Sequence, residues 1–68
     1  MNQRFLAVEL LKNLQPLTQL GLLKPQEAQH VASQYAKGNK YPLIHILNSG
    51  SIKEPYISIS EEIRRQYL

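Results

Sequence analysis

The side chains that offer acid–base or metal-binding chemistry in this chain are two histidines and five glutamates. His30 and His45 fall in different predicted helices, and no serine or glutamate lies at a spacing that indicates a catalytic pair. Glu27 and His30 are the only pair in which a histidine lies three or four residues from another possible metal ligand on one predicted helix. We interpret this pair as a surface contact on that helix, and we predict no metal site.

Sequence motifs for catalysis or nucleotide binding are absent. The chain contains no cysteine, no aspartate, no glycine-rich phosphate loop and no His-Glu-x-x-His zinc signature. We therefore predict no catalytic residue, no cofactor and no enzymatic activity for these 68 residues. The lack of cysteine also excludes a disulfide, which fits a cytoplasmic protein.

Length and charge limit the classes of protein that fit. Sixty-eight residues make one small domain, and eight lysines and arginines against five glutamates give a net charge of +3. The basic residues are dispersed along the chain, whereas nucleic-acid binding is better supported by a cluster on one face. A small basic helical nucleic-acid-binding domain is therefore the alternative function. No run of about 18 apolar residues predicts a membrane span, and no secretory signal is visible.

Residues 25–37 have the pattern of a complete helix. Pro25 suits its first turn, and Glu27 places a negative charge at the positive end of the helix dipole. Apolar residues recur at helical period along one narrow face: Ala28, Val31, Ala32, Tyr35 and Ala36. Gly38 can adopt the left-handed conformation that ends a helix. Because the face consists mostly of alanine, another helix can approach it closely.

A first helix is expected over residues 3–14, with Asn2 as a candidate N-cap. Four of its apolar residues share one face: Ala7, Leu10, Leu11 and Leu14. We expect Pro16 to end this helix, because proline disfavours the helical conformation at the residue before it. A short turn over residues 16–20 then leads to Gly21 within a leucine-rich corner.

A third helix is expected between Pro42 and Gly50, because a proline at the start and a glycine past the end bracket it in the favoured order. We expect its inner face to consist of Leu43, Ile46 and Leu47. A buried strand over residues 43–47 is the competing interpretation, since two of these residues are β-branched.

The last helix is expected to begin at Ser58, which forms a Ser-x-x-Glu capping box with Glu61. Its apolar stripe consists of Ile59, Ile63 and Tyr67. The preceding residues 51–57 are expected to form a loop, with Ile52 and Ile57 holding that loop on the core.

Together these segments predict an all-α fold, a small bundle of three to four short helices that forms a single domain over residues 1–68. Leucines and isoleucines supply its core. Four large amphipathic side chains remain: Tyr35, Tyr41, Tyr56 and Tyr67. Tyrosines either close the rim of a small core or anchor a protein interface, and we favour the rim.

Two short motifs stand out in this order of helices. Residues 21–28 read Gly-Leu-Leu-Lys-Pro-Gln-Glu-Ala, and residues 41–43 read Tyr-Pro-Leu at the start of the next helix. With them, residues 6–68 resemble the N-terminal domain of the secretion and pilus-assembly ATPases, the GspE and PilB type of type II secretion and type IV pili. Residues 57–68 resemble the helix in which those domains commonly end. The resemblance implies that the chain is an N-terminal fragment of a longer ATPase.

The resemblance also implies a role in docking and regulation. The small helical domain of that family engages the cytoplasmic part of an inner-membrane platform protein, and the Walker motifs lie in later domains of the chain. This implies a cytoplasmic location, peripheral to the inner membrane through the partner, and contacts with the later domains. Some relatives bind cyclic di-GMP, so a sensor of that messenger is a further alternative, although residues 4–6 and 40–42 depart from the binding motif.

The residues that we expect to contact a partner lie on the first predicted helix. Phe5, Val8 and Leu11 are candidates for apolar contact, and Arg4 and Lys12 are candidates for charge at its rim. The alternative interpretation places all three apolar residues in the core. Alanine at Phe5 distinguishes the two, because lost binding with unchanged melting indicates docking and lost folding indicates core.

Overall fold

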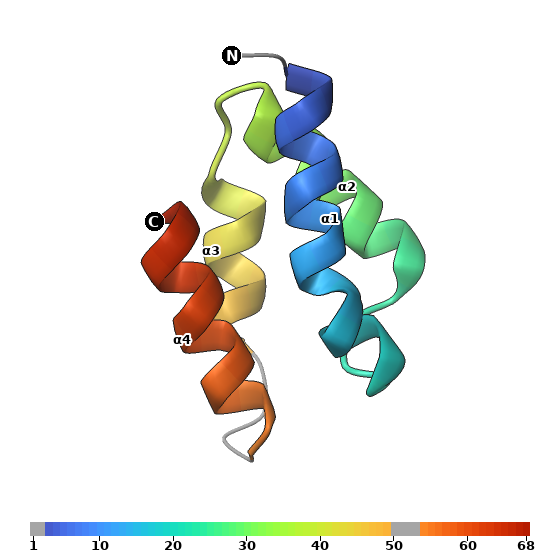
Figure 1. The fold of residues 1–68 in the computed structure, drawn as a ribbon, viewed down its shortest axis with the longest axis vertical. Helices are drawn as coiled ribbons and strands as arrows, with labels where there is room; N and C mark the ends of the chain where they lie inside the picture. The colour runs from blue at the N-terminus through green and yellow to red at the C-terminus, as the bar shows by residue number, and fades with distance from the viewer. Residues whose placement is uncertain (1–2, 50–53) are drawn as a thin grey trace.

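The computed structural model describes residues 3–49 and 54–68, which form four α-helices. In chain order these are α1 (Gln3–Gln19), α2 (Pro25–Ala36), α3 (Tyr41–Asn48) and α4 (Tyr56–Tyr67). Successive helices run in opposite directions (Figure 1). Helix α2 packs on α1, and α4 also lies beside α1. The described residues contain no strand, so the all-α prediction is confirmed and the strand interpretation of residues 43–47 is wrong.

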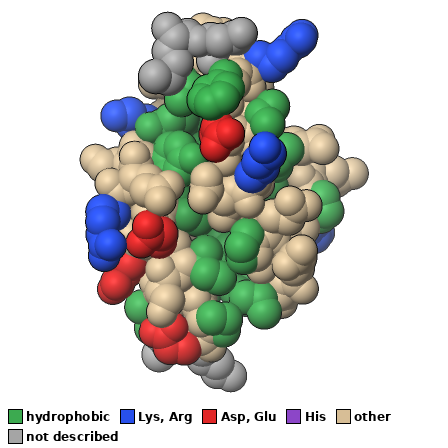
Figure 2. Space-filling view, viewed as in Figure 1, with side chains coloured by type: hydrophobic (Ala, Val, Ile, Leu, Met, Phe, Trp, Pro, Cys, Tyr) green, Lys and Arg blue, Asp and Glu red, His purple; other side chains and the backbone are tan. Residues whose placement is uncertain are grey.

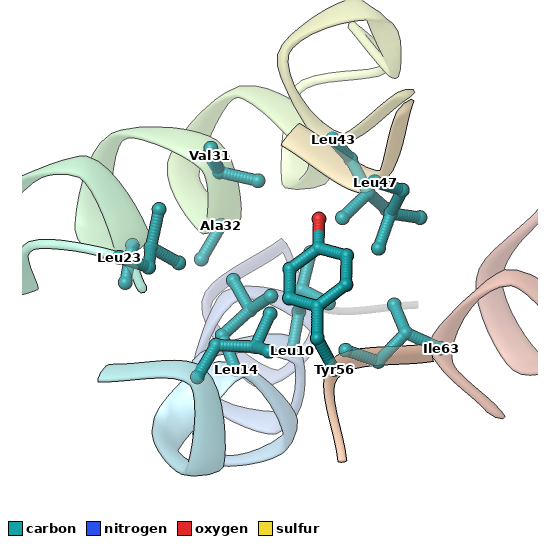
Figure 3. Packing of buried hydrophobic residues seen from close by; sticks show 11 residues of the cluster. Leu10, Leu14, Leu23, Val31, Ala32, Leu43, Leu47, Tyr56 and Ile63 are labelled. Atoms are coloured by element: carbon teal, nitrogen blue, oxygen red, sulfur yellow. The ribbon is translucent and has the colours of Figure 1, made fainter. Parts of the chain in front are cut away.

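The hydrophobic core lies where the four helices meet, and each helix contributes to it. Leu10, Leu14 and Leu43 are fully excluded from solvent. Figure 3 shows the ring of Tyr56 among these leucines, with its hydroxyl pointing toward α3, where it donates a hydrogen bond to the carbonyl of Ile46. The rest of the cluster consists of smaller or peripheral residues: Leu17, Leu23, Ala28, Val31, Ala32, Leu47 and Ile63. Burying each leucine contributes roughly 2 kcal/mol to folding.

Helix α1 continues through Pro16, so the predicted end of the first helix there and the separate turn over residues 16–20 are wrong. Proline has no amide hydrogen to donate to the carbonyl of Lys12, and its ring crowds that carbonyl. The helix persists because the next residue, Leu17, is only 2% exposed and joins the core together with Leu14. Burial of these two leucines offsets the local backbone cost of the proline, which is itself exposed.

Two glycines with positive φ follow the ends of α1 and α2: Gly21 at +76° and Gly38 at +99°. At Gly38 the amide donates to the carbonyl of Tyr35 at 3.0 Å, and the next amide, that of Asn39, donates to the carbonyl of Gln34 at 2.8 Å. This is the Schellman arrangement, which satisfies carbonyls that a helix end leaves without partners. The prediction that Gly38 closes the helix is therefore confirmed.

Helix α4 begins at Tyr56, before the predicted capping box. Tyr56 is 6% exposed, whereas Ser58 lies inside the first turn and its hydroxyl donates to the carboxylate of Glu54. The predicted N-cap role of Ser58 is therefore wrong, because burial of the Tyr56 ring sets where the helix starts. Ile57 was expected to hold a loop on the core, but it is an exposed residue of α4. Three further predictions lie outside the described residues: Asn2, Gly50 and Ile52.

A pair of tyrosines fastens the end of α4 to α1 and α2. The rings of Tyr35 and Tyr67 pack edge to face with centroids 5.5 Å apart, and the Tyr35 hydroxyl donates to the Tyr67 carbonyl at 2.8 Å. The side-chain amide of Asn13 on α1 donates to the Tyr67 hydroxyl, also at 2.8 Å. Burial raises the pKa of Tyr67 above its ordinary value; the Asn13 hydrogen bond opposes this effect, and Glu9 and Tyr35 add to it.

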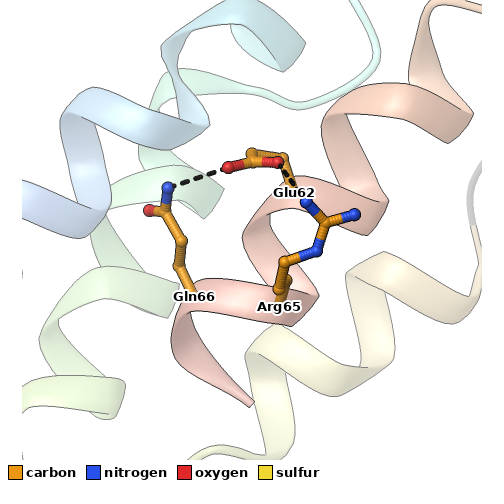
Figure 4. A network of polar contacts seen from close by, with 3 residues as sticks. All are labelled: Glu62, Arg65 and Gln66. Atoms are coloured by element: carbon orange, nitrogen blue, oxygen red, sulfur yellow. Dashed lines mark hydrogen bonds and ion pairs between the residues drawn. The ribbon is translucent and has the colours of Figure 1, made fainter.

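Two arginines near the end of α4 have different partners. Arg64 donates to the side-chain oxygen of Asn48 at 3.1 Å, which places its cation at the end of α3 where the helix dipole favours positive charge. Arg65 forms an ion pair with Glu62 at 3.3 Å, and Gln66 donates to the same carboxylate (Figure 4). Because both members of the ion pair are exposed, it contributes no more than about 1 kcal/mol.

We expect Pro16→Ala to raise the free energy of unfolding by about 1–2 kcal/mol, since alanine restores a helical amide and removes the crowding of the ring. The side chain is exposed, so the substitution removes no core packing. Urea denaturation followed by circular dichroism measures the change. As a control, Leu14→Ala leaves a cavity in the core and lowers the free energy by about 3 kcal/mol. An unchanged or lower value for P16A contradicts the cost assigned to the proline.

We expect Tyr67→Phe to lower the free energy of unfolding by about 1 kcal/mol at neutral pH, because the Asn13 amide loses one of its two acceptors and keeps only the carbonyl of Glu9. A raised pKa means that the folded protein holds the phenolic proton more tightly than the unfolded chain. This stabilisation is complete at a pH below 10.0, the pKa of tyrosine in the unfolded chain, and it is lost as the pH rises through the pKa of Tyr67 in the folded protein.

The difference between wild type and Y67F should therefore shrink above pH 10. Denaturation curves from pH 7 to about pH 11 test this, within the range where a tyrosine titrates. Tyr41→Phe, at an exposed ring, serves as the control and leaves stability unchanged. A difference that stays constant across this range contradicts the role given to Tyr67.

Candidate functional site

The N-terminal half of α1 carries the residues predicted to contact a partner. Phe5 is 57% exposed and Val8 is 45% exposed, and they lie about one helical turn apart. Arg4 and Lys12 flank them and are also exposed. Figure 2 shows green apolar side chains in the upper part of the molecule, where α1 begins, with blue basic side chains and one red acidic side chain beside them. We call these four residues the α1 patch.

Leu11, the fifth predicted contact residue, does not belong to the α1 patch. It is partly buried and packs against the core cluster. The core interpretation therefore holds for Leu11, whereas Phe5 and Val8 lie outside the core. Contact of the patch with a partner stays a prediction.

A groove between α2 and α3 forms a second candidate surface, which the sequence did not predict. Its main hollow has a volume of about 430 Å³, within the range of ligand and peptide pockets. The wall from α2 consists of Gln26, Glu27, His30 and Val31. The wall from α3 consists of Tyr41, Pro42, His45 and Ile46. Most of the lining surface is apolar.

The two histidines, which lie on different helices, line opposite walls of this groove. The ring of His45 stacks on that of Tyr41, with centroids 6.5 Å apart and planes inclined by 15°. Glu27 lies on the same wall as His30, one turn earlier. Among residues 3–49 and 54–68, no three side chains of histidine, cysteine, aspartate or glutamate are arranged to hold a metal ion.

A smaller hollow of about 130 Å³ continues the groove toward the turn between α1 and α2. It shares Glu27, His45 and Ile46 with the main hollow, and Leu22 also lines it. Leu22 is 44% exposed, and Tyr41, which lines only the main hollow, is 71% exposed. We call the two hollows together the α2–α3 groove. Each of them is thus lined by one exposed large hydrophobic side chain.

Lys37 and Lys40, in the turn between α2 and α3, are both exposed. None of the helices in the described part of the chain is long and apolar enough to cross a membrane.

Comparison with known proteins gives no match: no family model, no curated protein and no solved structure matches this chain. The resemblance to the N-terminal domains of secretion and pilus-assembly ATPases therefore depends on the motifs at residues 21–28 and 41–43. In the structure these motifs form the starts of α2 and α3, and they supply Gln26, Glu27, Tyr41 and Pro42 to the α2–α3 groove.

Proposed function

We propose that this chain is a protein-interaction domain without catalytic activity of its own, and that it belongs to the N-terminus of a type II secretion or type IV pilus assembly ATPase. The exposure of Phe5 supports the interaction role. The chain has one phenylalanine, and 57% of its surface faces solvent instead of contributing to a small core. Large apolar side chains that gather at the surface are typical of protein contacts.

Under this proposal the α1 patch contacts the cytoplasmic part of an inner-membrane platform protein. The patch has an apolar centre, Phe5 and Val8, with Arg4 and Lys12 at its edge. Interfaces commonly combine an apolar centre with a charged rim, and the rim charges steer the approach of an oppositely charged partner. The partner surface is therefore expected to be apolar with an acidic border. ATP hydrolysis belongs to later domains of the same chain.

We expect Phe5→Ala to weaken binding to the purified cytoplasmic domain of the platform protein by about tenfold or more, because truncating an aromatic anchor at the centre of an interface removes a large share of its binding energy. The melting temperature should stay within about 2 °C of wild type, since Phe5 lies outside the core. Isothermal titration calorimetry and thermal denaturation by circular dichroism provide the two measurements.

Ile57→Ala is the matched control for this experiment. It removes an exposed apolar side chain from α4, away from the α1 patch, and should leave the affinity unchanged. Absence of wild-type binding at high micromolar concentrations of the platform domain contradicts the docking role. A clear fall in melting temperature for F5A, with affinity retained, instead identifies Phe5 as a structural residue.

A further inference from the structure

We propose that the α2–α3 groove binds an amphipathic helix of a partner protein, one that presents apolar side chains and a lysine or arginine. The proposal concerns a different surface from the α1 patch. It therefore does not depend on the platform protein as partner of that patch, and the two can be tested separately.

The shape of the groove suits a helix. The two hollows, of about 430 Å³ and 130 Å³, adjoin each other and share the side chains of Glu27, His45 and Ile46. A helix that lies in a groove inserts side chains spaced by three, four or seven residues, which are about 5 to 10 Å apart along its axis. The larger hollow, lined by Val31 and Pro42, accepts an apolar anchor. The smaller hollow, where Leu22 and Leu23 lie beside Glu27 and Ser49, accepts the next side chain of the helix along its axis.

The charge of the groove indicates that the helix is basic. With histidine counted as neutral, Glu27 is the one formally charged residue that lines either hollow. Its carboxylate has no ion pair or hydrogen bond within the described part of the chain. The protein as a whole carries a net charge of +3, so this carboxylate is an acidic point on a basic molecule. Because Glu27 lines both hollows, a cation placed between the two inserted side chains of the helix reaches it.

The aromatic edge of the main hollow offers a second contact to the same helix. Tyr41 is 71% exposed, more than Phe5, and its ring is nearly parallel to that of His45, with centroids 6.5 Å apart. The face of an aromatic ring attracts a cation within about 6 Å and also covers apolar surface. A basic amphipathic helix satisfies both the carboxylate and this ring, whereas an acidic helix brings like charge to Glu27.

The test is an NMR titration of the ¹⁵N-labelled 68-residue protein with a designed peptide. The peptide has about 16 residues, enough to form a helix of four turns, with leucines at positions i, i+4 and i+7 and one lysine at i+3. A matched peptide has glutamate in place of that lysine. We expect changes in the amide chemical shifts of residues 26–31 and 41–46. The lysine peptide should bind about tenfold more tightly than the glutamate peptide, because the first forms a partly exposed ion pair with Glu27 and the second brings a like charge to it.

Substitutions at Glu27 test the charge directly. Glu27→Lys should weaken binding of the lysine peptide by about tenfold and strengthen that of the glutamate peptide, whereas Glu27→Gln should cause a loss of about threefold. The matched control Glu61→Lys makes the same change in net charge at an exposed position of α4 and should leave both affinities unchanged. Phe5→Ala should also leave them unchanged, since it lies in the α1 patch.

Several results would overturn the proposal. Equal affinity for the two peptides shows that the carboxylate does not select the helix, and shifts confined to α1 place the binding elsewhere. Absence of binding at millimolar concentrations of either peptide shows that the groove does not bind a helix of this kind. The remaining possible occupant of the groove is a second copy of this chain, and sedimentation of the unliganded protein tests for a dimer. If a dimer forms, if its formation broadens the NMR resonances of the groove residues, and if Glu27→Lys abolishes it, the groove binds a second copy instead of a partner helix.

Discussion

Burial of one row of leucines on α1 is the constraint on which the rest of the domain depends. Leu10, Leu14 and Leu17 recur at i, i+4 and i+7 and are at most 2% exposed. The other three helices are placed so that their small or apolar faces cover this row. A domain of this size buries a smaller share of its surface than a larger one, so the loss of one turn of this row removes a large part of its stability. Helix α1 therefore keeps its last turn even though a proline lies within it.

The parts of the fold that the sequence predicted are those that local chemistry determines. Gly38 ends α2 because only a residue tolerant of positive φ closes the Schellman arrangement, and this requirement is visible without knowledge of the tertiary structure. The two errors at helix ends have the opposite cause. At Pro16 and at Ser58 the local preference was correctly identified, but burial of a neighbouring side chain, Leu17 or Tyr56, outweighs it.

For the two candidate surfaces as well, the sequence predicted what depends on a single helix and missed what depends on the packing between helices. Helical periodicity showed that Phe5 and Val8 lie beside the core face of α1, but it left open whether another helix covers them. That depends on how far α2 and α4 extend across α1, which is a property of the packed domain. For the α2–α3 groove, the spacing of Glu27 and His30 was recognised on one helix, but nothing in the sequence placed His45 opposite them. Sites formed between helices require the angle and distance between those helices.

The overlap between the sequence motifs and the groove explains why the motifs alone carry limited information about function. Pro25 and Pro42 both serve to start a helix, which any helical bundle requires. Pro42 also lines the groove, and Glu27, placed where a carboxylate favours the helix start, faces it as well. A residue with both roles is expected from the fold even in a protein that binds nothing there. The proposals therefore depend most on two features that the fold does not require: the exposed ring of Tyr41, and Phe5 outside the core.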